Sequence, residues 1–181
     1  MPESSAGRTV WHCHLAVSLD GMIARSDGSF DWLEDYPPEE FGLSAFIAGV
    51  DAILMGRATY DAVRGMGDWP YPGKPTTVVT RHALPDAPPG VQACADGLKA
   101  AVAEMEARGH RRIWIEGGGQ VVRGMLGLGK LDVLEMAVIP IVLGDGIALF
   151  PRGTPETRLR LRSCDVRSGG ALHLVYQRQA A

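Results

Sequence analysis

The chain has 181 residues, of which 46% are hydrophobic, so it has the length of one domain and enough apolar side chains to fill one substantial core. Its formal net charge of −3 provides no basic field that would attract nucleic acid or anionic lipid. The three cysteines lie far apart and form neither a disulfide framework nor a CxxC pair. No stretch approaches the roughly 18 consecutive apolar residues of a membrane-spanning helix. We therefore expect a cytoplasmic protein that binds a small molecule, with no nucleic-acid or membrane partner.

Segments typical of strands alternate with segments typical of helices, which is the order expected for a mostly parallel sheet flanked by helices. Several strand candidates are short apolar runs without alternation, as in strands that are buried on both faces. Residues 1–9 are expected to be a flexible N-terminus, followed by a single domain over residues 10–179. The expected strands are residues 10–17, 52–55, 76–80, 91–94, 112–116 and 133–139.

Three helices are expected between these strands. The first covers residues 38–50 and has an apolar face. The clearest helix begins at Asp96, which is expected to be its N-cap, and ends at Gly109. The third helix covers residues 119–128 and starts directly after a strand.

The C-terminal part has a different pattern. Arginines alternate with leucines in residues 158–162, and strand character resumes at residues 172–176 after two glycines, so we expect a β-hairpin. The Pro-rich segments 69–75 and 85–90 are expected to be surface loops.

A glycine turn joins the end of a strand to the start of a helix in Glu116-Gly117-Gly118-Gly119-Gln120-Val121. Backbone N–H groups at such a helix N-terminus can bind an anion such as a diphosphate. A side chain at Gly118 is expected to push the backbone away from the diphosphate or to clash with a positive φ angle. Val122 stands where the Rossmann fingerprint has its last glycine, so the turn alone is equally compatible with a tight turn that binds no ligand.

Two further strand-to-helix junctions carry groups that suit a phosphate. One combines Gly56, Arg57 and Thr59 at a helix N-terminus. The other places Thr80 and Arg81 at the end of a strand, where they can bind a 2′-phosphate and so favour NADPH over NADH. Either arginine alone is also compatible with a solvated surface charge. Because ligands of α/β sheets bind at the carboxyl ends of strands, the three junctions together predict a nucleotide cofactor.

Four segments resemble the reductase domain of the bacterial riboflavin-biosynthesis deaminase-reductase: residues 18–24, 55–60, 116–119 and 140–150. The second and third are shared with dihydrofolate reductase, whereas Ser-Leu-Asp-Gly in the first and Leu-Gly-x-Gly in the last favour the riboflavin-type branch. The resemblance implies a three-layer α/β/α dihydrofolate-reductase-like fold, a mostly parallel sheet with an antiparallel C-terminal hairpin, and a homodimer. The chain lacks the His-x-Glu and Pro-Cys-x-x-Cys motifs of zinc deaminases, so it is similar to the reductase part alone.

By this resemblance the chain is an NADPH-dependent reductase of a small nitrogen heterocycle, similar to 5-amino-6-(5-phosphoribosylamino)uracil reductase of riboflavin biosynthesis. Residues 60–75 differ from those of the riboflavin enzyme, which leaves the substrate, pyrimidine-like or pterin-like, open. The alternatives are a dihydrofolate reductase and a catalytically silent nucleotide-binding module.

The resemblance also assigns residues to the cofactor. Val17 and Ala24 would lie beside the nicotinamide. Thr59 and residues 118–124 would bind the diphosphate, and residues 80–81 would hold the adenosine end.

Three carboxylates are candidates for catalysis. Glu116 lies between a buried strand and a glycine turn, where a carboxylate is costly unless it is paired, so a ligand-facing role is favoured. The resemblance also implies that Glu116 faces the substrate. Asp20 follows the first strand, although an Asp-Gly turn explains it equally well. Glu40 lies 15 residues before Met55, a spacing similar to that of the pterin-binding acid of dihydrofolate reductase, but an exposed glutamate in a first helical turn is the alternative.

Two histidines close to the N-terminus raise the question of a metal site. His12 and His14 are expected to project from the same face of a strand. Two ligands do not make a site, and no third one follows nearby in the sequence, so we expect no metal.

Overall fold

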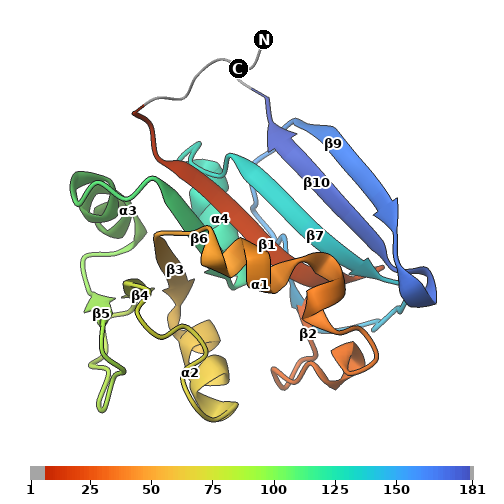
Figure 1. Cartoon of the computed structure of the whole chain (residues 1–181), viewed down its shortest axis with the longest axis horizontal. Helices are drawn as coiled ribbons and strands as arrows, with labels where there is room; N and C mark the ends of the chain where they lie inside the picture. The colour runs from red at the N-terminus through yellow and green to blue at the C-terminus, as the bar shows by residue number, and fades with distance from the viewer. Residues whose placement is uncertain (1–6, 180–181) are drawn as a thin grey trace.

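The computed structural model in Figure 1 describes residues 7–179 and contains an eight-stranded sheet. Five parallel pairings join the six strands from β5 to β7, and β10 is antiparallel to both β7 and β9. The six expected strands and the C-terminal hairpin are therefore confirmed. Of the expected flexible N-terminus, residues 1–6 lie outside the described residues. In spatial order the strands are β5 (Val91–Cys94), β4 (Thr76–Val79), β3 (Ala52–Gly56), β6 (Arg112–Gly117), β1 (Val10–Ser18), β7 (Val133–Ile139), β10 (Leu172–Arg178) and β9 (Leu159–Val166).

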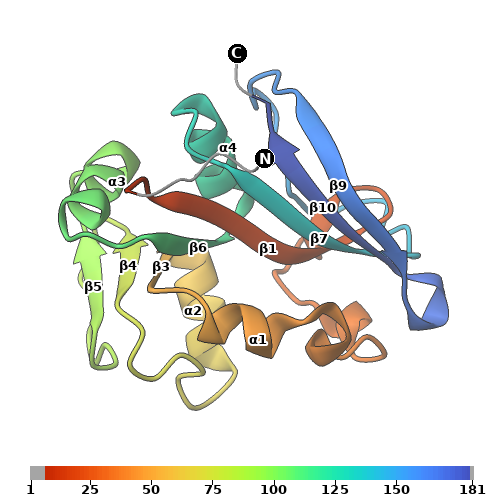
Figure 2. The same cartoon turned by 45° about the horizontal axis from the view of Figure 1, so that its top comes forward.

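Helices cover both faces of the sheet, as expected for a three-layer fold (Figure 2). One face carries α1 (Leu43–Ala48) and α2 (Arg57–Gly65). The opposite face carries α3 (Leu98–Ala107) and α4 (Gly119–Gly127).

The side chains of β6 alternate between the two cores that these helices close. Ile113 and Ile115 are fully buried against α3 and α4, whereas Trp114 packs with the residues of α1 and α2. Because the side-chain period of a strand is two, Glu116 belongs to the same face as Trp114. Glu116, the acid of β6, therefore lies on the face of the sheet that α1 and α2 cover.

Two helix boundaries differ from the sequence prediction. The helix expected over residues 38–50 is divided into a short 3-10 helix, Pro38–Phe41, and α1. Gly42 separates them because it has a left-handed backbone with φ 72°, which ends one helix and begins another. Asp96 is not the N-cap of α3: that position is Gly97, with φ 87°, and no side chain caps it.

A second, two-stranded sheet was not expected from the sequence. It pairs β2 (Met22–Ala24) with β8 (Ile147–Ala148) in antiparallel fashion. This pairing joins the segment 18–24 to the segment 140–150, which lie far apart in the chain. Among the helices described within residues 7–179, none has the length and apolar character needed to cross a membrane.

Candidate functional site

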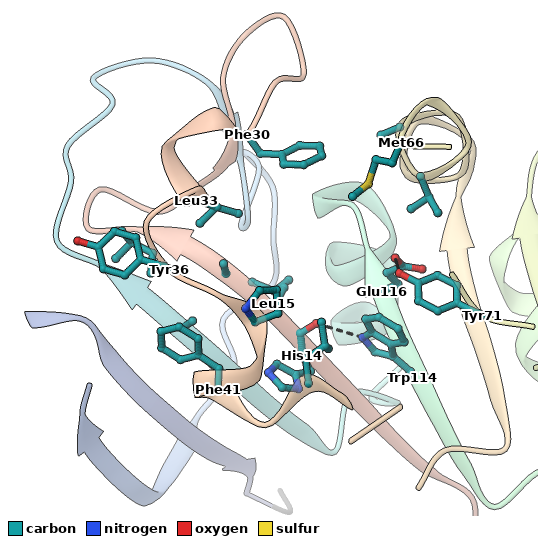
Figure 3. A pocket seen from close by; sticks show the side chains of 17 residues that line it. His14, Leu15, Phe30, Leu33, Tyr36, Phe41, Met66, Tyr71, Trp114 and Glu116 are labelled. Atoms are coloured by element: carbon teal, nitrogen blue, oxygen red, sulfur yellow. Dashed lines mark hydrogen bonds between the residues drawn. The ribbon is translucent and has the colours of Figure 1, made fainter. Parts of the chain in front are cut away.

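A cavity of about 350 Å³ opens on the face of the sheet that α1 and α2 cover, and we call it the Glu116 pocket. Most of its wall is aromatic or aliphatic. Figure 3 shows Phe30, Leu33 and Phe41 on one side and Met66 and Trp114 on the other. An apolar cavity with few polar groups holds a flat organic molecule and excludes water from the polar atoms in its wall.

Glu116 supplies the carboxylate of this pocket. The hydroxyl of Tyr71 donates a hydrogen bond of 2.5 Å to Glu116 Oε1, while Oε2 is buried and has no partner among the described residues. Burial raises the pKa of Glu116 to about 7, and the Tyr71 hydrogen bond opposes this rise only in part. The carboxyl group can therefore exchange a proton near neutral pH, and its Oε2 atom is available to a bound molecule.

Tyr71 is a residue that sequence reasoning missed. The segment 69–75 was expected to be a surface loop, but the Tyr71 side chain is only 8% exposed, so this expectation was wrong at that position. Its ring packs edge-on against Trp69 and Trp114, with centroids 5.3 and 5.2 Å away. Burial and the neighbouring carboxyl group raise the pKa of Tyr71, so the phenol stays protonated and remains a donor. No local pattern signals this role, because the contact joins residues 45 positions apart.

A second cavity, of about 490 Å³, lies at the carboxyl ends of β3 and β6, and we call it the glycine cleft. Both α2 and α4 begin at this cleft. The first N–H groups of a helix have no carbonyl partner within it, and its N-terminus carries a partial positive charge, so two such ends suit a diphosphate. Six residues predicted to bind the cofactor line the cleft: Gly56, Arg57, Gly118, Gly119, Gln120 and Val121.

The glycines of the turn meet different requirements. A Cβ atom at Gly119 would lie 2.2 Å from the carbonyl oxygen of Ala148, so close packing against β8 excludes a side chain there. A Cβ atom at Gly118 would lie 3.5 Å from Thr59 Oγ1 and 3.6 Å from Ile23 Cδ1, which are ordinary contacts. The positive φ expected at Gly118 was wrong: φ is −73° there and +116° at Gly117. The Gly117–Gly118 peptide bond is cis.

The other predicted cofactor residues lie around this cleft without lining either cavity. Val17 and Ala24 are buried, and Thr80 is buried and accepts a hydrogen bond from the His82 N–H. Arg81 follows Thr80 and is exposed.

Arg57 is already engaged within the protein. Its guanidinium donates to Asp61 at 2.8 Å and to the carbonyl of Ala83 at 3.2 Å. Arg57 therefore links the start of α2 to the loop that follows Thr80, and it keeps a positive group at the edge of the glycine cleft.

The two other acids predicted as catalytic candidates lie outside both cavities. Asp20 accepts hydrogen bonds from the Ser18 hydroxyl and from the N–H groups of Gly144 and Leu143, which lower its pKa to about 2. This acid thus fastens the loop after β7 to the end of β1. Glu40 is exposed and accepts a hydrogen bond from the Ser168 hydroxyl.

A histidine cluster adjoins the floor of the Glu116 pocket, which His14 lines. Sheet pairing brings Glu135 and His173 next to His12 and His14, so the ligands absent nearby in the sequence come from β7 and β10. Burial opposes ionisation of Glu135, but hydrogen bonds of 2.7 Å from His12 and His173 contribute to a pKa of about 2. Arg167 can only donate, so His173 Nδ1 accepts and His173 Nε2 carries the proton. A metal ion bound to His173 Nε2 would force the proton onto Nδ1, where it would face the N–H groups of Arg167 and the hydrogen bond would be lost. That no metal binds here stays a prediction.

Comparisons with known proteins agree with this fold. The chain is 38% identical over 167 residues to the uncharacterized protein YwjB of Bacillus subtilis, covering 91% of this chain and 95% of that protein. A solved structure described as a putative riboflavin biosynthesis protein from Shewanella sp. PV-4 has a TM-score of 0.84 and 29% identity, covering 95% of this chain and 100% of that one. A pyrimidine reductase-like protein from Corynebacterium diphtheriae shares the fold, with a TM-score of 0.80 and 19% identity, covering 100% of this chain and 96% of that one.

The family model of the RibD C-terminal domain matches residues 11–172, which span both cavities and all eight strands of the main sheet except Val10 of β1 and the last six residues of β10. The resemblance seen in four short segments therefore extends over nearly the whole chain. The chain belongs to the RibD C-terminal domain family.

Proposed function

We propose that the protein is an NADPH-dependent reductase, with the cofactor in the glycine cleft and a small planar nitrogen heterocycle in the Glu116 pocket. One observation carries this proposal: both cavities lie at the end of β6, where Glu116 lines one and Gly118, two residues later, lines the other. The family and its riboflavin-type members support a reductase-like role.

The groups at the glycine cleft fit a dinucleotide. Two helix N-termini converge there, and Gly118, which carries no side chain, lines the cleft beside the start of α4. Exposed Arg81, beside Thr80, can pair with a 2′-phosphate, which favours NADPH over NADH. NADPH supplies a hydride when bound.

The protein itself supplies a positioned proton donor. Reduction of a C=N bond adds a hydride to carbon and requires a proton on nitrogen. Glu116 Oε2 is buried, has no protein partner among the described residues, and belongs to a carboxyl group with a pKa of about 7. A protonated Glu116 can therefore give its proton to the substrate nitrogen and regain one from solvent, while Tyr71 holds the carboxyl group in place.

The riboflavin-type assignment is preferred to a dihydrofolate reductase on structural grounds. The alternative placed its substrate-binding acid at Glu40, which is exposed and hydrogen bonded to Ser168 rather than lining the pocket. Glu116, on β6, is the acid available to a ligand.

A single-turnover experiment tests the proposed function. NADPH absorbance is followed after mixing the protein with 5-amino-6-ribosylaminouracil, its 5′-phosphate or dihydrofolate. We expect loss of absorbance with at least one uracil derivative. NADPH binding without oxidation by any of these acceptors would instead identify a nucleotide-binding module that lacks the chemistry.

A further inference from the structure

The Glu116 pocket contains no cationic side chain. Among the residues that line it, Glu116 is the only one with a formal charge near neutral pH, and none is Lys or Arg. His14, in the floor, is buried, and burial lowers its pKa to about 4, so its ring is neutral. A phosphate group carries up to two negative charges and is bound in proteins by guanidinium, ammonium or clustered N–H groups. The residues that line the pocket provide no guanidinium or ammonium group for a phosphate.

The segment that forms one wall of the same pocket is acidic. We call residues 31–41 the wall segment, because Leu33, Tyr36, Pro38 and Phe41 from it line the cavity. Its remaining side chains include four exposed carboxylates: Glu34, Asp35, Glu39 and Glu40. A negative potential at the mouth of a cleft lowers the local concentration of anions and raises that of cations.

Three cations near the pocket, Arg25, Arg167 and Lys74, are held by other groups. Arg25 forms a two-point contact with Asp31 at 2.7 and 3.2 Å, and Arg167 donates to His173 behind the pocket floor. Lys74 donates to the carbonyl of Val50 at 2.6 Å. Arg64 of α2 is exposed and is not among the lining residues.

We propose that the substrate of this pocket is an unphosphorylated heterocycle, neutral or cationic, whose imine nitrogen faces Glu116 Oε2, and that the acidic wall segment excludes phosphorylated analogues. The proposal deepens the reductase function proposed above and rests on it. It separates this chain from an enzyme that acts on a phosphoribosyl compound, even though the fold is the same. Selectivity arises from an unfavourable charge as much as from a favourable contact.

The matched pair of 5-amino-6-ribosylaminouracil and its 5′-phosphate tests the proposal, because the two compounds differ only in the phosphate. Their dissociation constants are measured by calorimetry on the whole chain, without NADPH, at low ionic strength. We expect the unphosphorylated compound to bind at least tenfold more tightly. Equal affinity, tighter binding of the 5′-phosphate, or failure of both compounds to bind at millimolar concentration would each overturn the proposal.

A double variant tests the origin of the selectivity. Glu34→Gln with Asp35→Asn removes two charges from the wall segment, and we expect the preference to fall at least threefold. The control, Glu104→Gln with Glu156→Gln, removes two exposed charges away from the pocket and should leave the preference unchanged. An equal change in both double variants would show that net charge, and not the wall segment, sets the preference. Because the readout is binding without cofactor, failure of the reductase function would appear separately, as absence of NADPH oxidation.

Discussion

Glu116 and Tyr71 form a polar pair inside an otherwise apolar pocket. Burial raises the pKa of Glu116 to about 7, whereas the Tyr71 hydrogen bond acts in the opposite direction because it stabilises the carboxylate. Glu116 is therefore protonated in a substantial fraction of molecules near neutral pH. Asp20 shows the contrast: three hydrogen bonds hold its pKa at about 2, so it remains an anion with a structural contact to the loop after β7.

The pH dependence of turnover follows from this pair. The proposed proton donor is the protonated form, so kcat/KM should be high below about pH 7 and fall as pH rises through the pKa of Glu116. Tyr71→Phe removes the hydrogen bond that lowers this pKa, so the descending limb should move to higher pH. Steady-state rates between pH 5.5 and 9 provide the measurement. A limb that moves to lower pH, or does not move, in the Phe variant would contradict the assignment of Glu116 as the donor.

Two glycines that line the glycine cleft differ in how tightly their surroundings pack. Gly119 lets α4 start against the backbone of β8, since an added Cβ would lie 2.2 Å from the Ala148 carbonyl oxygen. Gly118 has φ −73°, which any residue adopts, and an added Cβ would make only ordinary contacts with Thr59 and Ile23. Packing thus explains Gly119, and the open cleft explains Gly118.

This distinction predicts opposite behaviour for two alanine variants. Gly118→Ala should keep a melting temperature within a few degrees of the unchanged protein but weaken NADPH binding tenfold or more, because the added methyl group would lie beside Thr59, which we propose to contact the diphosphate. Gly119→Ala should lower the melting temperature clearly, because the backbone of β8 must move. Thermal unfolding and enhancement of NADPH fluorescence measure the two effects. Normal NADPH affinity in Gly118→Ala would show that the turn is structural only.

The elements that could be predicted from the sequence are those with a strong local signal. Buried apolar runs such as residues 52–55 identified the strands, and the glycine turn identified the start of α4. The break at Gly42 was missed because a single glycine is tolerated within a helical pattern. The pairing of β2 with β8 was missed because strands of three and two residues carry almost no periodic signal.

The candidate site was predictable to a similar extent. Six of the twelve predicted cofactor residues line the glycine cleft because a strand-to-helix junction is a local feature of the chain. Tyr71 and the wall segment reach Glu116 only through tertiary packing, so no spacing in the sequence indicates them. Glu135 and His173 meet His14 for the same reason, through the register of three strands.

At the scale of the whole molecule, the sheet places two different environments at the end of one strand. Glu116, near the end of β6, lines an apolar pocket beneath α1 and α2. Gly118, which follows β6 directly, lines a cleft where two helices begin. Such an arrangement allows a hydride donor and its acceptor to meet while only one of them contacts the acid. The homodimer implied by the resemblance stays a prediction, although Leu19, Val142 and Phe150 are apolar and exposed around the loop after β7.

The central claim is that Glu116 acts on the substrate and not on the cofactor, and Glu116→Gln tests it most directly because glutamine keeps the size and the hydrogen bonding but cannot donate the proton of a carboxyl group. NADPH affinity and the single-turnover rate of NADPH oxidation are measured on the same preparation. We predict NADPH affinity within a few-fold of the unchanged protein and kcat/KM lower by roughly 10² or more. Weakened NADPH binding with turnover otherwise intact would contradict the account.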